Sequence, residues 1–89
     1  MTAEDIELMQ EKIVLLCHFA GVFGLPEDRL LRGLAKAGYE IDQATLERHL
    51  RYLESKGWII TIDKELRPDL RRWVTRAPGD EYLMRQKLI

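Results

Sequence analysis

The sequence predicts a mostly helical α+β domain with three helices, a β-hairpin and a C-terminal helix. Apolar residues recur at spacings of three and four in successive segments before Gly57, which is the period of amphipathic helices. At Trp58 the pattern changes to a run of strand-forming residues. Glycines separate the segments, as is typical of helix ends.

Length and composition indicate one globular domain that covers residues 1–89. A chain of 89 residues buries a single small core. With 46% hydrophobic and 33% charged residues the composition is globular, and no stretch approaches the roughly 20 apolar residues of a membrane span. The acidic start and the single cysteine favour neither a secretory signal nor a disulfide framework. We therefore expect a soluble, cytoplasmic protein.

The first helix is predicted from about Glu4 to Phe19. Six residues lie on one side of a 3.6-residue period, namely Ile6, Met9, Ile13, Leu16, Cys17 and Ala20. After two glycines, Pro26 is expected at the first helical position of a second helix, which closes near Ala37. Its predicted buried residues are Leu30, Leu31 and Leu34.

The third helix, residues 43–56, has the most complete set of signals. Asp42 is the predicted N-cap, and Ile41 and Leu46 have the spacing of a hydrophobic staple. Gly57 supplies the left-handed stop. The expected inward stripe consists of Leu46, His49, Leu50 and Leu53.

Two strands and a last helix follow. Residues 58–62 and 73–75 are strand formers, and the loop 63–72 between them carries Pro68, so a hairpin with a long loop is expected. The last helix is expected to begin near Pro78 and to carry Tyr82, Leu83 and Leu88.

Charge is distributed unevenly along the chain, although the net charge is only −1. Residues 1–42 hold four basic and eight acidic side chains, whereas residues 43–76 hold eight basic and five acidic ones. Such asymmetry indicates either a nucleic-acid surface or an ordinary solvated one.

The predicted order of elements is that of a winged helix-turn-helix, and two segments carry a family likeness. TLERHLRYLESKGWI resembles the third-helix segment of bacterial winged-helix regulators of the ArsR, MarR and PadR kind. WVTRAPGDEYL is similar to the Leu-Thr-x-x-Gly-x-x-Tyr-Leu pattern that follows the wing in many of them. Size and layout more loosely resemble small winged-helix proteins of Mu-like prophages.

This resemblance implies a transcriptional regulator that binds double-stranded DNA, without a cofactor or catalytic activity. The helix at 43–56 would lie in the major groove, with Gln43, Thr45 and Arg48 reading bases. Phosphate contacts would come from the end of that helix and from the wing, through Arg51, Lys56, Lys64, Arg67, Arg71 and Arg72. The first and last helices would form a homodimer. Glu47 would face phosphates or pair with Arg51.

Other chemistries have less support in the sequence. One thiolate cannot fill a four-coordinate metal site, so Cys17 is interpreted as a small buried hydrophobe and His49 as a satisfied, partly buried histidine. No motif indicates an enzyme. Trp58 and Trp73 are expected to pack against the helices more than to stack on bases.

The alternative function is a winged-helix protein-interaction module in a phage or transcription-related assembly, because one scaffold hosts both uses.

Overall fold

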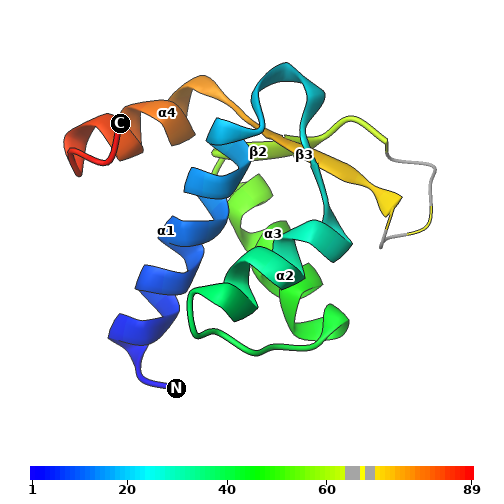
Figure 1. Cartoon of the computed structure of the whole chain (residues 1–89). Helices are drawn as coiled ribbons and strands as arrows, with labels where there is room; N and C mark the ends of the chain where they lie inside the picture. The colour runs from blue at the N-terminus through cyan, green and yellow to red at the C-terminus, as the bar shows by residue number, and fades with distance from the viewer. Residues whose placement is uncertain (64–66, 68–69) are drawn as a thin grey trace.

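The computed structural model describes residues 1–63, 67 and 70–89, and within them the chain is a mostly helical α+β protein with a small antiparallel sheet (Figure 1). The elements in chain order are α1 (Ala3–Phe19), the 3-10 turn η1 (Gly21–Phe23), β1 (Leu25–Pro26), α2 (Glu27–Lys36), α3 (Gln43–Ser55), β2 (Ile59–Thr61), β3 (Arg72–Thr75) and α4 (Ala77–Arg85).

Side-chain caps set the beginnings of α1 and α3. The Thr2 hydroxyl accepts from the Asp5 N–H at 3.1 Å, and the Asp5 carboxylate accepts from the Thr2 N–H at 3.3 Å, which forms a capping box. The predicted cap of α3 is confirmed, because Asp42 Oδ1 accepts from the Thr45 N–H at 2.8 Å. This bond also lowers the pKa of the Asp42 carboxyl. Gly57, with φ of +76°, supplies the predicted left-handed stop.

The start of α2 differs from the prediction. Pro26 is not the first helical residue; it has an extended ψ of 154°, ends β1 and is the N-cap of α2. Residues 25–26 pair with β3 in the register Leu25 with Trp73. A two-residue strand leaves no periodic signal in the sequence, so the helix was predicted one residue too early.

The sheet has the order β1-β3-β2 and is antiparallel throughout. The predicted hairpin is confirmed by the pairing of Ile60 with Val74. Its first strand is shorter than the predicted 58–62, whereas the second begins one residue earlier, at Arg72. The Thr61 hydroxyl donates to the Arg72 carbonyl at 3.1 Å, which adds a bond at the end of the strand pair next to the connecting loop.

The core forms where α1 packs against α2, β3 and α4, with α3 closing the other side. Its buried hydrophobic residues are Met9, Ile13, Val14, Cys17, Leu30, Leu34, Leu46, Leu50, Leu53, Ile59, Trp73 and Leu83. Cys17 is fully buried as predicted, and burial raises the pKa of its thiol to about 12. The thiol is therefore protonated at neutral pH and packs as a small apolar group.

Helix α4 is held against Trp58, in the turn between α3 and β2. The indole ring of Trp58 stacks on the phenol ring of Tyr82 with centroids 4.2 Å apart, as the packing interpretation of Trp58 predicted. Gly79 lies so close to the Trp58 carbonyl that a Cβ there would collide with the oxygen. Leu88, which was predicted in this helix, lies beyond its end and is 37% exposed.

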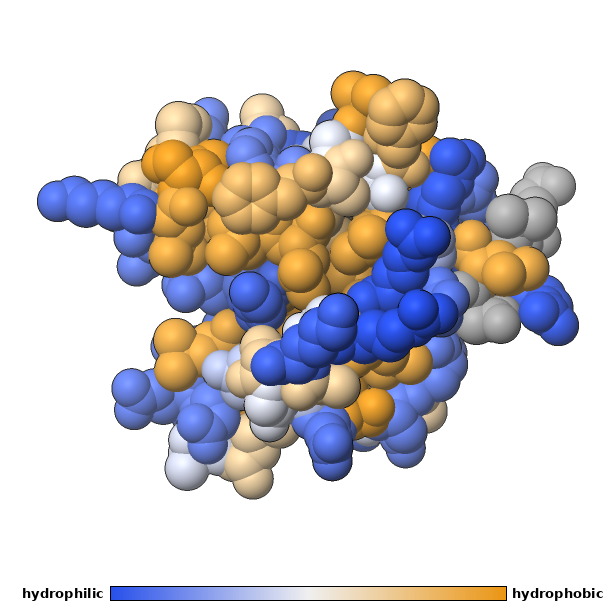
Figure 2. Space-filling model, in the orientation of Figure 1, coloured by the Kyte–Doolittle hydropathy of each residue, from blue (hydrophilic) through white to orange (hydrophobic). Residues whose placement is uncertain are grey.

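The turn between α1 and β1 carries apolar side chains outside the core. Phe19, Val22 and Phe23 are 72%, 85% and 76% exposed. The turn after α1 lies at the top of the molecule in Figure 1, and Figure 2, in the same orientation, shows apolar surface there. The helical periods of the sequence do not reveal these exposed side chains, because Phe19 is the last residue of α1, and Val22 and Phe23 lie beyond it in η1.

Candidate nucleic-acid interface

Helix α3 exposes one face to solvent, opposite its buried leucines. Positions four and three apart share a helix face, so the exposed residues Ala44, Arg48, Arg51 and Ser55 form one row, here named the outer stripe. Arg48 Nη2 donates to the Thr45 hydroxyl at 3.2 Å, which steadies the guanidinium over the first turns of the helix. The outer stripe therefore has two arginines in its middle and small side chains at both ends.

Gln43, predicted as a base reader, is engaged inside the protein. Its amide donates to Oε1 of Glu27, whose other oxygen accepts from the indole N–H of Trp73 at 2.8 Å. Glu27 is fully buried at the start of α2. Burial raises the pKa of its carboxyl, and the bonds from Trp73 and Gln43 act in the opposite direction. One carboxyl thus ties together α2, α3 and β3, and Gln43 positions α3 in this arrangement.

The side of α3 that faces the sheet forms a cleft of about 310 Å³ with β2 and β3. We name it the α3–β3 cleft; its lining residues are Glu27, Glu47, Arg51, Glu54, Thr61, Arg71 and Trp73. Glu47 and Glu54 are half-buried there, on the flank of the helix and off the outer stripe. Their carboxylates share the cleft with Arg51 and Arg71, so the negative charge of α3 is gathered beside guanidinium groups.

Arg72, predicted to contact phosphate, makes a two-point ion pair across the hairpin. Its Nε lies 2.6 Å from Asp63 Oδ2 and its Nη2 lies 3.0 Å from Asp63 Oδ1. The Arg72 backbone N–H also donates to the same carboxylate at 3.0 Å. These bonds lower the pKa of the Asp63 carboxyl. The pair fixes the base of the loop that follows β2.

The remaining predicted contacts are spread over the hairpin and the end of α3. Lys56 caps the C-terminus of α3 and turns toward the Trp58 ring, with its Nζ 3.8 Å from the ring centroid. Arg67 is exposed, and its carbonyl accepts from the Leu70 N–H at 2.9 Å. Lys64 lies outside the described residues. The structure therefore groups Arg48 and Arg51 on one face and directs Lys56 to another.

Both histidines have partners within the fold. His49 is half-buried and its Nδ1 is bonded to the Gln10 amide at 3.0 Å, which confirms the interpretation of a satisfied histidine. Burial, followed by the charge of Arg48, lowers the pKa of its ring. His18 Nδ1 lies 2.8 Å from Asp80 Oδ1 and links the end of α1 to α4. Among residues 1–63, 67 and 70–89 no group of three or more His, Cys, Asp and Glu side chains is placed to hold a metal ion.

Comparison with protein-family models, with curated proteins and with solved structures gives no match. In the described part of the chain, the helices are too short or too polar to cross a membrane.

Proposed function

We propose that this chain is a winged-helix DNA-binding protein that acts as a transcriptional regulator. Three helices followed by a hairpin, with the strand order β1-β3-β2, support the winged-helix assignment. In this assignment α3 is the recognition helix and the β2–β3 hairpin is the wing.

The observation that carries the proposal is the outer stripe of α3. Arg48 and Arg51 project from its middle, Ala44 and Ser55 leave space at its ends, and Glu47 and Glu54 lie on the flank beside the hairpin. The major groove of B-DNA, about 12 Å wide, admits one α-helix with its side chains. A helix whose solvent face is basic enters that groove more readily than one whose face is mixed.

The residues of α3 divide into two roles in this proposal. Arg48, near the N-terminal half of the helix and steadied by Thr45, reads a guanine edge through two hydrogen bonds. Arg51, one turn further, binds a phosphate. Gln43 holds Glu27 and so orients the helix instead of reading adenine.

The hairpin contributes phosphate contacts beside the groove. Lys64, Arg67, Arg71 and Arg72 provide positive charge along this segment of the sequence. The Arg72 ion pair with Asp63 fixes where the loop leaves the sheet, while the Arg72 side chain remains 43% exposed. We further propose that α1 and α4 form the contact of a homodimer, which would present two copies of α3 to successive turns of DNA.

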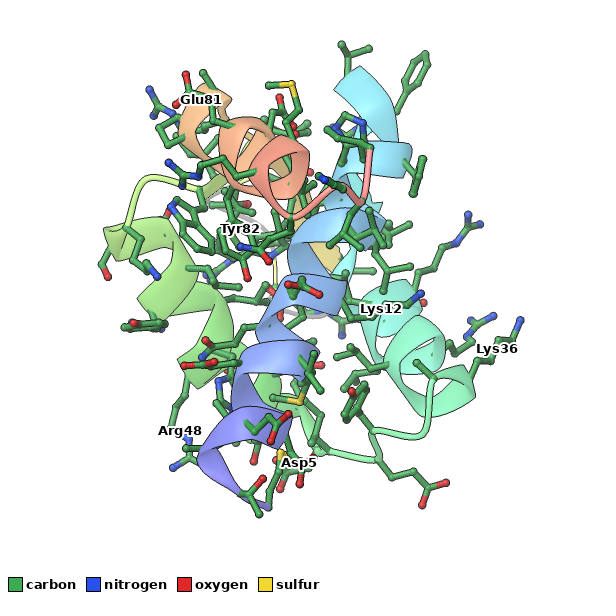
Figure 3. All side chains as sticks on the ribbon, turned by 90° about the vertical axis from the view of Figure 1, so that its left-hand side faces the viewer. Asp5, Lys12, Lys36, Arg48, Glu81 and Tyr82 are labelled. Atoms are coloured by element: carbon green, nitrogen blue, oxygen red, sulfur yellow. The ribbon has the colours of Figure 1, made fainter. Side chains whose placement is uncertain are left out.

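Anisotropy of a fluorescent duplex with random sequence tests the proposal through matched variants. Arg48→Ala combined with Arg51→Ala should weaken binding to random DNA at least tenfold at low salt, because a phosphate contact and a groove contact are both lost. Arg32→Ala combined with Lys36→Ala is the control, since it also removes two positive charges, both from α2, whose Lys36 lies away from Arg48 (Figure 3). Equal loss in both variants would show that only net charge matters and would contradict the proposed interface.

The same experiment separates the second candidate function, a protein-interaction module in a phage or transcription-related assembly. If the unaltered protein is not retained by DNA at low salt, the basic outer stripe meets an acidic protein surface instead.

A further inference from the structure

A second cleft lies between α1, the end of α3 and α4, and none of its lining residues belongs to the outer stripe. Its volume is about 490 Å³, within the range of about 300–1,000 Å³ that is usual for binding pockets. Figure 3 looks onto this face, where Tyr82 lies between the three helices. We name it the acidic–aromatic cleft: its acidic residues are Glu4, Glu7 and Glu11, and its aromatic ones are Tyr52, Trp58 and Tyr82.

The aromatic part of the cleft is held in place by the fold. Trp58 and Tyr82 are stacked with 28° between their ring planes. The Tyr82 hydroxyl donates to Glu11 Oε2 at 2.8 Å, which links α4 to α1. Burial, together with the hydrogen bond and the charge of Glu11, raises the pKa of Tyr82 to about 12. The phenol therefore remains a neutral donor, and the rings form a preorganised surface.

An ammonium group of the protein itself already occupies this surface. Lys56 Nζ lies 3.8 Å from the centroid of the Trp58 ring and 5.4 Å from that of Tyr52. Cations bind ring faces at such distances because the face of the ring is electronegative. Three carboxylates and this one ammonium line the cleft, so its lining remains negative with Lys56 in place.

We propose that the acidic–aromatic cleft binds a lysine- or arginine-bearing segment of a partner protein. One cationic side chain of the segment lies on Trp58 in place of Lys56, and its neighbours pair with Glu4 and Glu7. The segment displaces the Lys56 ammonium from the Trp58 ring, so Lys56 competes with the segment for this position.

Charge and exposed apolar surface identify this occupant. Three carboxylates repel phosphates, so the cleft does not fit nucleic acid. Leu8 and Tyr52, both in the lining, are 45% and 49% exposed, which gives a peptide with apolar residues a surface to cover. A small polyamine would supply cations but would leave these side chains uncovered.

The test measures the affinity of the full chain for a fluorescein-labelled peptide composed of lysine, leucine and serine. The control peptide has glutamate at each lysine position. Titrations at about 0.15 M salt restrict the influence of charges to roughly 8 Å, so remote charges contribute little. We expect saturable binding of the basic peptide and none of the acidic one.

Two variants with matched controls test the site itself. Glu4→Gln with Glu7→Gln should weaken peptide binding about threefold or more, whereas Glu40→Gln, in the exposed loop before α3, should not change it. Lys56→Ala should tighten binding by about two- to fivefold because the competitor is removed. Lys36→Ala removes the same charge elsewhere and should leave the affinity unchanged.

Several results would overturn the proposal. One is an absence of peptide binding by a protein that circular dichroism shows to be folded. Another is an equal change of peptide affinity in Lys56→Ala and Lys36→Ala. Binding of spermine as tight as that of the peptide would assign the cleft to a small polycation. Self-association that is lost in the Glu4→Gln, Glu7→Gln variant would show that the proposed homodimer contact of α1 and α4 covers the cleft, and would exclude a peptide there. The peptide titrations contain no DNA and the outer stripe is unchanged in all these variants, so a failure of peptide binding is distinguishable from a failure of DNA binding.

Discussion

The buried carboxyl of Glu27 makes a specific prediction about Gln43. Replacement of Gln43 by alanine removes a donor to the Glu27 carboxyl and leaves the bond from the indole N–H of Trp73 in place. A hydrogen bond to a charged group contributes about 1.5–3 kcal/mol, and the higher helix propensity of alanine offsets up to about 0.5 kcal/mol. We expect a net loss of about 1–2.5 kcal/mol in the free energy of unfolding.

The pH dependence of this loss follows from the raised pKa of Glu27 in the folded state. An acid whose pKa is higher when folded contributes stability while it is protonated, and that contribution is lost as the pH rises through the folded pKa. Loss of the Gln43 bond raises the folded pKa further, because that bond favours the charged form. The destabilisation by Gln43→Ala should therefore be larger at pH 8 than at pH 4.

Urea unfolding followed by tryptophan fluorescence measures this effect. At a slope of about 1 kcal/mol per molar urea, which suits a small domain, the midpoint at pH 8 should fall by about 1 M or more. Gln86→Ala is the control, because Gln86 lies exposed after α4 and is also a glutamine-to-alanine change. An unchanged midpoint for Gln43→Ala, or an equal loss at pH 4 and pH 8, would refute the role assigned to the Glu27 carboxyl.

Three further predictions concern packing and caps. Gly79→Ala should cost about 1–3 kcal/mol in the free energy of unfolding, because its Cβ meets the Trp58 carbonyl; a midpoint equal to that of the unaltered protein would show that α4 moves freely. Asp42→Ala should cost about 0.5–2 kcal/mol through loss of the α3 cap, whereas Asp42→Ser should retain most of it. Cys17 should not react with a thiol reagent at pH 8 until urea unfolds the chain, and rapid labelling of the folded protein would contradict its burial.

Local signals in the sequence predicted the helices and the hairpin well. The cap and the stop of α3 act within a few residues of the helix ends, so Asp42 and Gly57 are recognisable without any tertiary contact. The period of the leucines likewise depends only on helix geometry, and Leu46, Leu50 and Leu53 are all buried. The mostly helical α+β class follows from these local features.

Features that depend on residues far apart in the sequence were missed. Strand β1 forms because Leu25 pairs with Trp73, and the sequence of its two residues does not indicate that partner. The bonds of Glu27 to Gln43 and Trp73 also join separate elements. A buried carboxyl directly after Pro26 looked like an ordinary favourable charge at a helix start. Gln43 was therefore predicted as a base reader from its position in α3 alone.

For the candidate site too, the helical period predicted some features, while others are shown only by the structure. Exposure of Arg48 and Arg51 follows from the helical period, so their shared face was predictable. The partner of Arg72, the carboxylate of Asp63, depends on how the two strands of the hairpin pair. The rings that Lys56 contacts, those of Tyr52 and Trp58, lie within four residues of it in the sequence, but only the structure shows that the ammonium turns toward them. A count of basic residues in 43–76 could not distinguish side chains that face solvent from those engaged within the protein.

The dependence of DNA affinity on salt is the measurement that tests the proposed function most directly. The protein would be titrated into random-sequence duplex at several salt concentrations, and the logarithm of the association constant plotted against that of the salt. Each phosphate contact contributes a slope of about −0.9, so contacts from Arg51 and the hairpin predict a slope of about −3 to −5 with micromolar binding at low salt. No binding at low salt, or a slope near zero, would contradict the DNA interface on α3.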